Sequence, residues 1–241
     1  QNSNECGLMS ASAGLVQGGR FASKSQFPWM ASLLITYNNF FLNSSGLLLS
    51  HRHILSPGTA VSFYNEQSRY FNAISLHRVK ILLAALSQND RNSLLVTPTV
   101  ITIHPTMKEV DDTPINNVAI ITLENFVQFS EFIRPICLWT FNDELRYVSG
   151  SAFYTAGYGV DESGKVSNIR KYARISLVDL KRCEDSYEKY SNIFHETNAF
   201  CAQGSSSESA CDFDDFLFVK YNDRWYLRGL SLLNFHFDNF N

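Results

Sequence analysis

The sequence lacks any apolar run close to the roughly 20 residues that a membrane-spanning helix needs. It also lacks a polybasic stretch, and its net charge of −3 at pH 7 argues against a surface for nucleic acid or anionic lipid. No two cysteines have the close CxxC spacing of a metal site, and no repeat of fixed period occurs. We therefore expect no membrane span, no nucleic-acid partner, no metal and no other cofactor.

The chain does have the composition of an ordinary globular protein. It contains 241 residues, of which 45% are hydrophobic, enough for one large domain or two small ones with a sizeable core. Its five scattered cysteines favour disulfides in an oxidising compartment, with one cysteine left over. Because Gln1-Asn2-Ser3 has no apolar signal segment, we expect a mature secreted chain. Asn43-Ser44-Ser45 is a sequon for N-glycosylation, although a three-residue motif also arises by chance.

Most apolar runs are of strand length and are separated by turn residues, which predicts an all-β sandwich or barrel. Only residues 177–190 have a helical rhythm, and we expect one short helix near 178–190. The runs that predict strands are 30–35, 46–50, 79–84, 118–123, 152–157, 216–220 and 225–233.

Six blocks of sequence, in order, resemble the chymotrypsin/trypsin serine protease family, particularly insect extracellular proteases and their inactive homologues. The resemblance implies two packed six-stranded antiparallel β-barrels with a cleft between them. It also implies a protease-like domain over residues 15–241, preceded by a leader, residues 1–14, that is tethered by Cys6. The blocks are 16–19 with 27–33, 45–50 with 52–55, 116–121, 133–138, 156–159 and 224–229.

The resemblance also implies how the cysteines pair. Cys6 would bond to Cys137 and hold the leader, and Cys183 would bond to Cys201 around the short helix. Cys211 lies where a cysteine normally precedes the nucleophile loop, but no cysteine follows it in this chain. Cys211 is then either a buried free thiol, the interpretation that we favour, or bonded outside the chain.

The residues that align with the catalytic triad are Thr59, Asn117 and Asp215, in place of histidine, aspartate and serine. Threonine is not a base near neutral pH. An asparagine does not stabilise an imidazolium as a carboxylate does. The disulfide that normally flanks the histidine is also absent, since its two positions hold Ser44 and Ala60.

The nucleophile loop of the family reads Gly-Asp-Ser-Gly-Gly-Pro, whereas here Cys211 is followed by Asp-Phe-Asp-Asp-Phe-Leu. Asp215 takes the serine position when counted from Cys211, but the loop is two residues short when counted back from Trp225, so the gap stays unplaced. Either count leaves no serine and none of the glycines that shape the oxyanion hole. Activation by cleavage is also not expected, because Leu15, rather than a basic residue, precedes Val16.

Other catalytic sets are weak candidates. His51 and His53 lie two residues apart, and Asp212, Asp214 and Asp215 form an acidic stretch, but we interpret them as ordinary surface histidines and a solvated loop. Loss of one triad member costs about 10⁶-fold in turnover in a related mechanism, and further losses add little. The sequence thus predicts a protein that is not an enzyme.

Three functions remain open at this point. The first is a secreted, monomeric pseudoprotease that binds a protein: either a salivary factor acting on a host immune or blood component, or a haemolymph cofactor acting with an insect defence-cascade protease. The second is a small-molecule or glycan binder whose remodelled cleft is walled by Phe213 and Phe216. The third is a residual hydrolase. The family also continues about 30 residues past Ser231, so we expect a missing C-terminal helix, by truncation or by a different closure of the second barrel.

Overall fold

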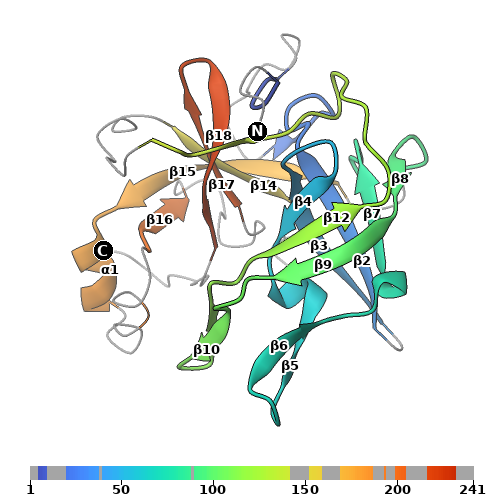
Figure 1. Cartoon of the computed structure of the whole chain (residues 1–241). Coiled ribbons are helices and arrows are strands. Elements are labelled where there is room, and N and C mark those ends of the chain that lie inside the picture. The colour runs from blue at the N-terminus through green and yellow to red at the C-terminus, as the bar shows by residue number, and fades with distance from the viewer. Residues whose placement is uncertain are drawn as a thin grey trace.

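Runs of β-branched and apolar residues form two large sheets that curl into the two-barrel architecture expected from the resemblance (Figure 1). The computed structural model describes residues 5–9, 20–37, 40–87, 90–141, 152–158, 169–186, 193, 199–204 and 216–231. The strands pair antiparallel with one exception, the short parallel contact between β13 and β18.

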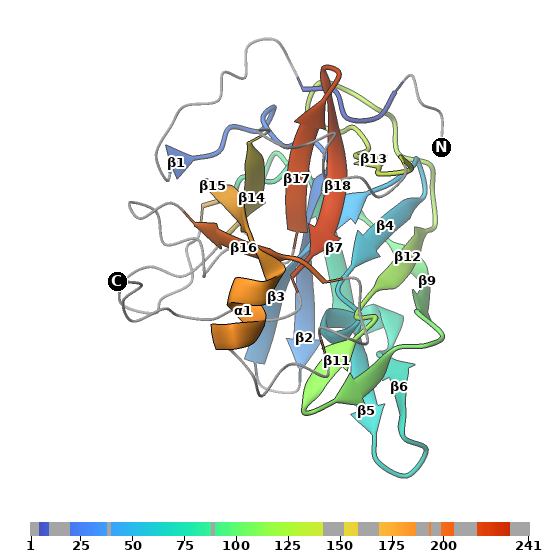
Figure 2. The same ribbon diagram turned by 90° about the vertical axis from the view of Figure 1, so that its left-hand side faces the viewer.

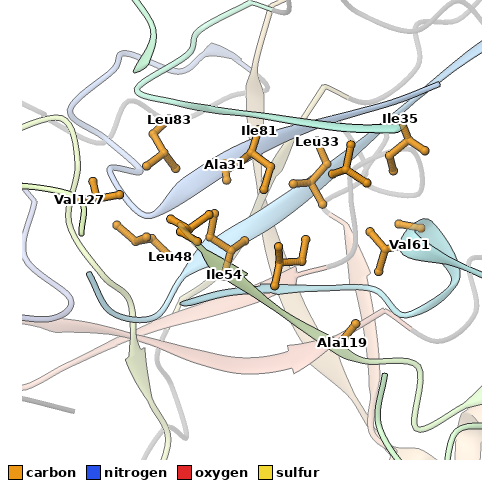
Figure 3. Packing of buried hydrophobic residues seen from close by; sticks show 14 of the residues in the cluster. Ala31, Leu33, Ile35, Leu48, Ile54, Val61, Ile81, Leu83, Ala119 and Val127 are labelled. Atoms are coloured by element: carbon orange, nitrogen blue, oxygen red, sulfur yellow. The ribbon is translucent and has the colours of Figure 1, made fainter. Parts of the chain in front are cut away.

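The first sheet has the strand order β8-β7-β2-β3-β4-β12-β9. Alternate residues of β7 and β12 are buried, as the two-residue period of a strand requires. Their side chains meet those of β2 and β4 in one apolar cluster, seen in Figure 3 around Leu33, Ile54 and Ile81. The strands are β2 (Met30–Tyr37), β3 (Phe40–Leu48), β4 (His53–Ser56), β7 (Val79–Leu83), β8 (Leu94–Val96), β9 (Pro98–Ile103) and β12 (Ala119–Leu123).

The second sheet has the order β1-β15-β14-β17-β18-β13, and β16 pairs with β15. An aromatic cluster between the two sheets includes Trp29, directly before β2 of the first sheet, and Phe218 and Trp225 of the second, and all three are buried. The strands are β1 (Arg20–Phe21), β13 (Cys137–Leu138), β14 (Phe153–Gly157), β15 (Lys171–Val178), β16 (Cys201–Gly204), β17 (Phe216–Tyr221) and β18 (Arg224–Leu230).

Each sheet has seven described strands, one more than the six expected, and the count includes short edge strands: β8 in the first sheet, β1 and β13 in the second. The predicted short helix is α1 (Leu180–Ser186), and the side chain of Asp179 accepts a hydrogen bond from the Lys181 backbone N–H at its start. Tyr187 and Tyr190, which contributed to its predicted rhythm, lie outside the described residues, as does the whole segment 232–241 on which the expected loss of a C-terminal helix depends.

Two hairpins, absent from the list of predicted strands, project at the same end of the first sheet (Figures 1 and 2). Residues 62–65, 70–73 and 108–110 are mostly exposed and polar or aromatic, so they carry no core-facing apolar pattern. Residues 113–115 do alternate, with Thr113 and Ile115 buried, but three residues are too few to predict a strand. The hairpins are β5 (Ser62–Asn65) with β6 (Tyr70–Ala73), and β10 (Lys108–Val110) with β11 (Thr113–Ile115). Two 3₁₀ turns, η1 (Thr59–Val61) and η2 (Leu76–Arg78), precede β5 and β7.

Both disulfides that the resemblance implied are present. The bond between Cys6 and Cys137 attaches residues 5–9 to the second barrel, and Cys183 bonds to Cys201, joining α1 to β16. Backbone hydrogen bonds hold the same N-terminal segment: the Gly7 N–H donates to Pro135 O at 2.8 Å, and the Trp225 N–H donates to Gly7 O at 2.9 Å. The described part of the leader is therefore packed on the domain.

Candidate functional site

The end of β4 and the start of β12 lie together, because the two strands pair antiparallel with Ser56 opposite Ala119. Chain leaving β4 at Ser56 and chain entering β12 at Ala119 must therefore emerge at the same end of the sheet. Thr59 follows β4 by three residues and Asn117 precedes β12 by two, so the register brings these two positions next to one another although they are 58 residues apart.

Thr59 and Asn117 form two hydrogen bonds with each other. The Thr59 backbone N–H donates to Asn117 Oδ1 at 2.8 Å, and Asn117 Nδ2 donates to Thr59 Oγ1 at 3.1 Å. A backbone N–H can only donate, so the amide oxygen must face it and the amide nitrogen must face the hydroxyl. Asn117 therefore accepts one hydrogen bond from Thr59 and donates another to it. An ionised carboxylate has no N–H or O–H group and could not donate the second bond.

Packing behind this pair leaves no room for a side chain at Gly58. A Cβ atom at Gly58 would lie 2.5 Å from Met107 Sδ and 3.3 Å from Asn117 Oδ1. Met107 itself is buried, and its backbone N–H is anchored to His104 O at 3.0 Å. The thioether of Met107 thus occupies the space that a side chain at Gly58, next to Thr59, would need.

The histidines of the described residues are held elsewhere. His51 Nδ1 lies 2.7 Å from Val127 O, and its ring stacks on Phe129 with centroids 3.7 Å apart. Because the Val127 carbonyl can only accept, His51 Nδ1 must carry the proton and donate it. His53 pairs with Ser50, with 2.8 Å between Nδ1 and Oγ.

His77 lies in η2, and His104 Nδ1 contacts Thr106 Oγ1 at 3.0 Å. None of the four histidines within the described ranges forms a hydrogen bond to Thr59 or Asn117. The described part of the site therefore presents a hydroxyl and an amide, and no base that could take a proton near neutral pH.

The Asp90 carboxylate helps to connect the two barrels. It forms a 2.8 Å ion pair with Lys24 and accepts backbone N–H groups from Leu86 and Asn92 at 3.1 and 3.0 Å. Burial alone would raise the pKa of Asp90, but the Lys24 and backbone hydrogen bonds outweigh it, so the pKa lies below its ordinary value. From the same loop, Leu86 O accepts the Arg170 backbone N–H at 2.9 Å, next to β15 of the second sheet.

A second polar contact crosses between the barrels. Ser32 Oγ on β2 and Tyr158 Oη, just after β14, are hydrogen-bonded, and both residues are buried. Together with the contacts of Asp90, this bond adds polar contacts to the aromatic core between the two barrels. The resemblance places the cleft where the two barrels meet.

Several predicted site residues lie outside the described residues: Asp215, Cys211, Phe213, Asp214 and Val16. Phe216 is described and corrects one expectation. Its side chain is only 2% exposed and belongs to the aromatic core between the sheets, so it does not wall a ligand pocket. The run 216–220 was predicted as a strand and corresponds to β17, but the sequence did not show that the Phe216 side chain points into the core.

The positions of the absent disulfide are both buried. Ala60 is 5% exposed and belongs to the core of the first barrel, and Ser44 on β3 is 9% exposed. Small buried side chains at both positions fit a site from which the pair of sulfur atoms has been removed.

Comparison with known proteins agrees with the two-barrel architecture. Residues 16–214 match the family described as Trypsin. The chain belongs to the trypsin family. Similar curated proteins include CLIP domain-containing serine protease B9 of Anopheles gambiae, 23% identical over 94% of this chain and 58% of that protein. Melanization protease 1 of Drosophila melanogaster is 26% identical (89% and 58%), and the proclotting enzyme of Tachypleus tridentatus is 26% identical (87% and 56%).

This trypsin-family chain thus spans a little over half the length of these relatives. Within the described residues no helix has the length and apolar character to cross a membrane.

Proposed function

We propose that this chain is a secreted serine protease homologue that does not catalyse proteolysis and acts by binding another protein. The observation that carries the proposal is the pair of hydrogen bonds between Thr59 and Asn117. In the trypsin family these are the positions of the catalytic histidine and aspartate, and their contact across 58 residues supports the alignment on which that assignment depends.

The chemistry of the pair supports an inactive site. Asparagine in place of aspartate alone costs about 10⁴-fold in turnover in chymotrypsin-type proteases. Here the base is replaced too, and Asn117 spends both ends of its amide on Thr59. The sequence Asp-Phe-Asp-Asp-Phe-Leu after Cys211 also lacks the serine and the glycines of the nucleophile loop.

The names of the relatives support a protein partner. They include a phenoloxidase-activating enzyme of Spodoptera litura, a melanization protease and a proclotting enzyme. Two disulfides, which persist in oxidising compartments, support an extracellular location. We propose that the partner is a serine protease of an arthropod defence cascade. The alternative, a salivary factor, would bind a vertebrate blood or immune protein instead.

The first experiment tests catalysis. The purified, disulfide-bonded protein is incubated with a broad panel of fluorogenic peptides and with a fluorophosphonate probe for active-site serines. Trypsin is the positive control, and heat-denatured protein shows the background. We expect neither turnover nor labelling. Steady turnover that a serine-directed inhibitor removes would overturn the non-catalytic part of the proposal and leave a residual hydrolase.

The second experiment tests binding. Immobilised protein is exposed to purified cascade proteases, as zymogen and as active enzyme, and the dissociation constant and the activation rate of the zymogen are measured. We expect a micromolar or tighter dissociation constant for one of the two forms. A dissociation constant above about 1 mM for every cascade protease would overturn this partner class. If a vertebrate plasma protein binds instead, the salivary function replaces it. Stabilisation by a small molecule or glycan alone would favour the second candidate function.

A further inference from the structure

The sequon Asn43-Ser44-Ser45 lies where β3 passes from its exposed to its buried half. Residues 40–42 are exposed, Asn43 is half-buried, and residues 44–48 are buried. Asn43 pairs with Leu34 of β2, whereas the neighbouring pairs place Ser44 opposite Leu33 and Leu42 opposite Ile35.

Directly paired residues share one face of a sheet, and Leu33 and Ile35 face the core of the first barrel. Asn43 therefore lies on the opposite, outer face of β3.

Phe41 lies on the same outer face as Asn43, two residues earlier on the strand. Its side chain is 74% exposed, one of the most exposed large apolar side chains in the described residues. Two residues along a strand span about 6.6 Å, so the Phe41 ring lies within reach of a sugar attached to Asn43. Phe40, also exposed, belongs to the other face and already stacks on Tyr37 with ring centroids 5.4 Å apart.

The edge of β3 beside Asn43 is open among the described strands. β4 pairs with β3 only at Leu47 and Leu48, so among the described strands nothing pairs with β3 at Asn43 on the side away from β2. Figures 1 and 2 both show β2 and β3 running well beyond the end of β4. No described strand therefore covers this edge of β3 next to Asn43.

We propose that Asn43 carries an N-linked glycan and that the Phe41 ring packs against its first sugar. The Asn43 amide nitrogen bonds to the anomeric carbon of an oligosaccharide, a lipid diphosphate leaves, and the amide loses one proton. Ser45 is 0% exposed in the fold, so this transfer takes place on the extended chain before β3 forms. The inference rests on the secretion proposed above, because the transfer occurs in the secretory pathway.

The aromatic contact has a physical reason. One face of a pyranose ring presents mainly C–H groups, and covering the Phe41 ring with that face removes apolar surface of both from water. Phe41 otherwise has no described aromatic neighbour, unlike Phe40, and stays largely exposed. Contact with the sugar thus gives a reason for an exposed phenylalanine two residues before Asn43 on the same face of β3.

Occupancy is tested first. The protein is secreted from insect cells, and glycopeptide and intact masses are measured before and after peptide N-glycosidase treatment. We expect a glycan mass at Asn43, removed by the enzyme and absent from Asn43→Gln. Secreted protein with unmodified Asn43 would overturn the inference and leave the non-catalytic function untouched. Protein that carries a functional signal peptide and still remains in the cytosol would instead overturn the proposed secretion.

The contact with Phe41 is tested by thermal unfolding of glycosylated and enzymatically deglycosylated protein. We expect Phe41→Ala to lower Tm by roughly 1–4 °C in the glycosylated form and by less than about 1 °C in the deglycosylated form. Phe40→Ala is the matched control, and it should shift Tm equally in both forms. An equal shift for Phe41→Ala in both forms would show that its ring does not contact the glycan.

Discussion

Replacing Gly58 with alanine tests whether Met107 fills the space beside the degenerate pair. Gly58 has φ −62° and ψ −41°, a backbone conformation open to any residue. At such a position Gly→Ala by itself stabilises a protein by about 0.4–1 kcal/mol, because it restricts the unfolded chain. The new Cβ, however, would lie 2.5 Å from Met107 Sδ and 3.1 Å from Met107 Cε. Overpacking of a core costs about 1–3 kcal/mol.

The balance of these two effects decides the sign. The end of a methionine side chain is flexible, which lowers the cost of the clash, but Met107 is only 5% exposed and has little space to move into. We therefore expect Gly58→Ala to destabilise the protein by about 1 kcal/mol, a fall in Tm of roughly 2–4 °C for a chain of this size.

The assay is urea unfolding of four proteins: wild type, Gly58→Ala, Met107→Ala and the double variant. Met107→Ala should cost about 2–4 kcal/mol by leaving a cavity. In that background Gly58→Ala should become neutral or stabilise by about 0.5 kcal/mol, because the clash is gone. Met107→Leu, which keeps the volume, is the control. If Gly58→Ala stabilises the wild type and the two changes are additive, Met107 does not occupy this space and the reasoning is refuted.

Three further outcomes follow from the described contacts. Asn117→Ala removes both hydrogen bonds to Thr59, and because the site is partly exposed the expected loss in urea unfolding is about 1 kcal/mol; a loss above about 3 kcal/mol would mean that the pair is more buried than described. Asp90→Asn should cost about 1–2 kcal/mol at pH 7 by weakening the pair with Lys24. Since the pKa of Asp90 is lowered in the folded state, its contribution is complete above the unfolded pKa of about 4 and is lost as the pH falls through the folded value. The difference in stability between wild type and variant should therefore shrink as the pH is lowered from about 4, and a difference that stays constant contradicts this. Gly7→Ala places a Cβ 2.4 Å from a backbone oxygen of β18 at φ +68°, so circular dichroism melting should show a fall in Tm of at least roughly 5 °C, and an unaltered Tm would contradict the docking of residues 5–9.

Much of the scaffold was predictable because its strands carry strong apolar patterns. The predicted runs 79–84 and 118–123 correspond to β7 and β12, whose alternate residues face the core. The resemblance also implied the disulfide pairs that the structure contains. Such features depend on local pattern, or on blocks of sequence that keep their order along the chain.

Other elements escaped prediction because their stability comes from elsewhere in the fold. Strands β5 and β6 form a projecting hairpin with exposed aromatic and polar residues, so no periodic apolar signal marks them. Phe216 was expected to wall the remodelled cleft, but β17 places its side chain in the core between the sheets. Its burial depends on contacts with side chains from distant strands, which no local pattern encodes.

The sequence by itself determined that the chain has the protease-like scaffold. It also determined which residues, Thr59 and Asn117, occupy the positions of the catalytic histidine and aspartate. Only the tertiary structure decided that these two residues bind each other and that Met107 closes the space behind them. The physical reason is the register between β4 and β12. The identity of each side chain can be read from the sequence. The contact between Thr59 and Asn117, which are 58 residues apart, forms only when β4 and β12 pair.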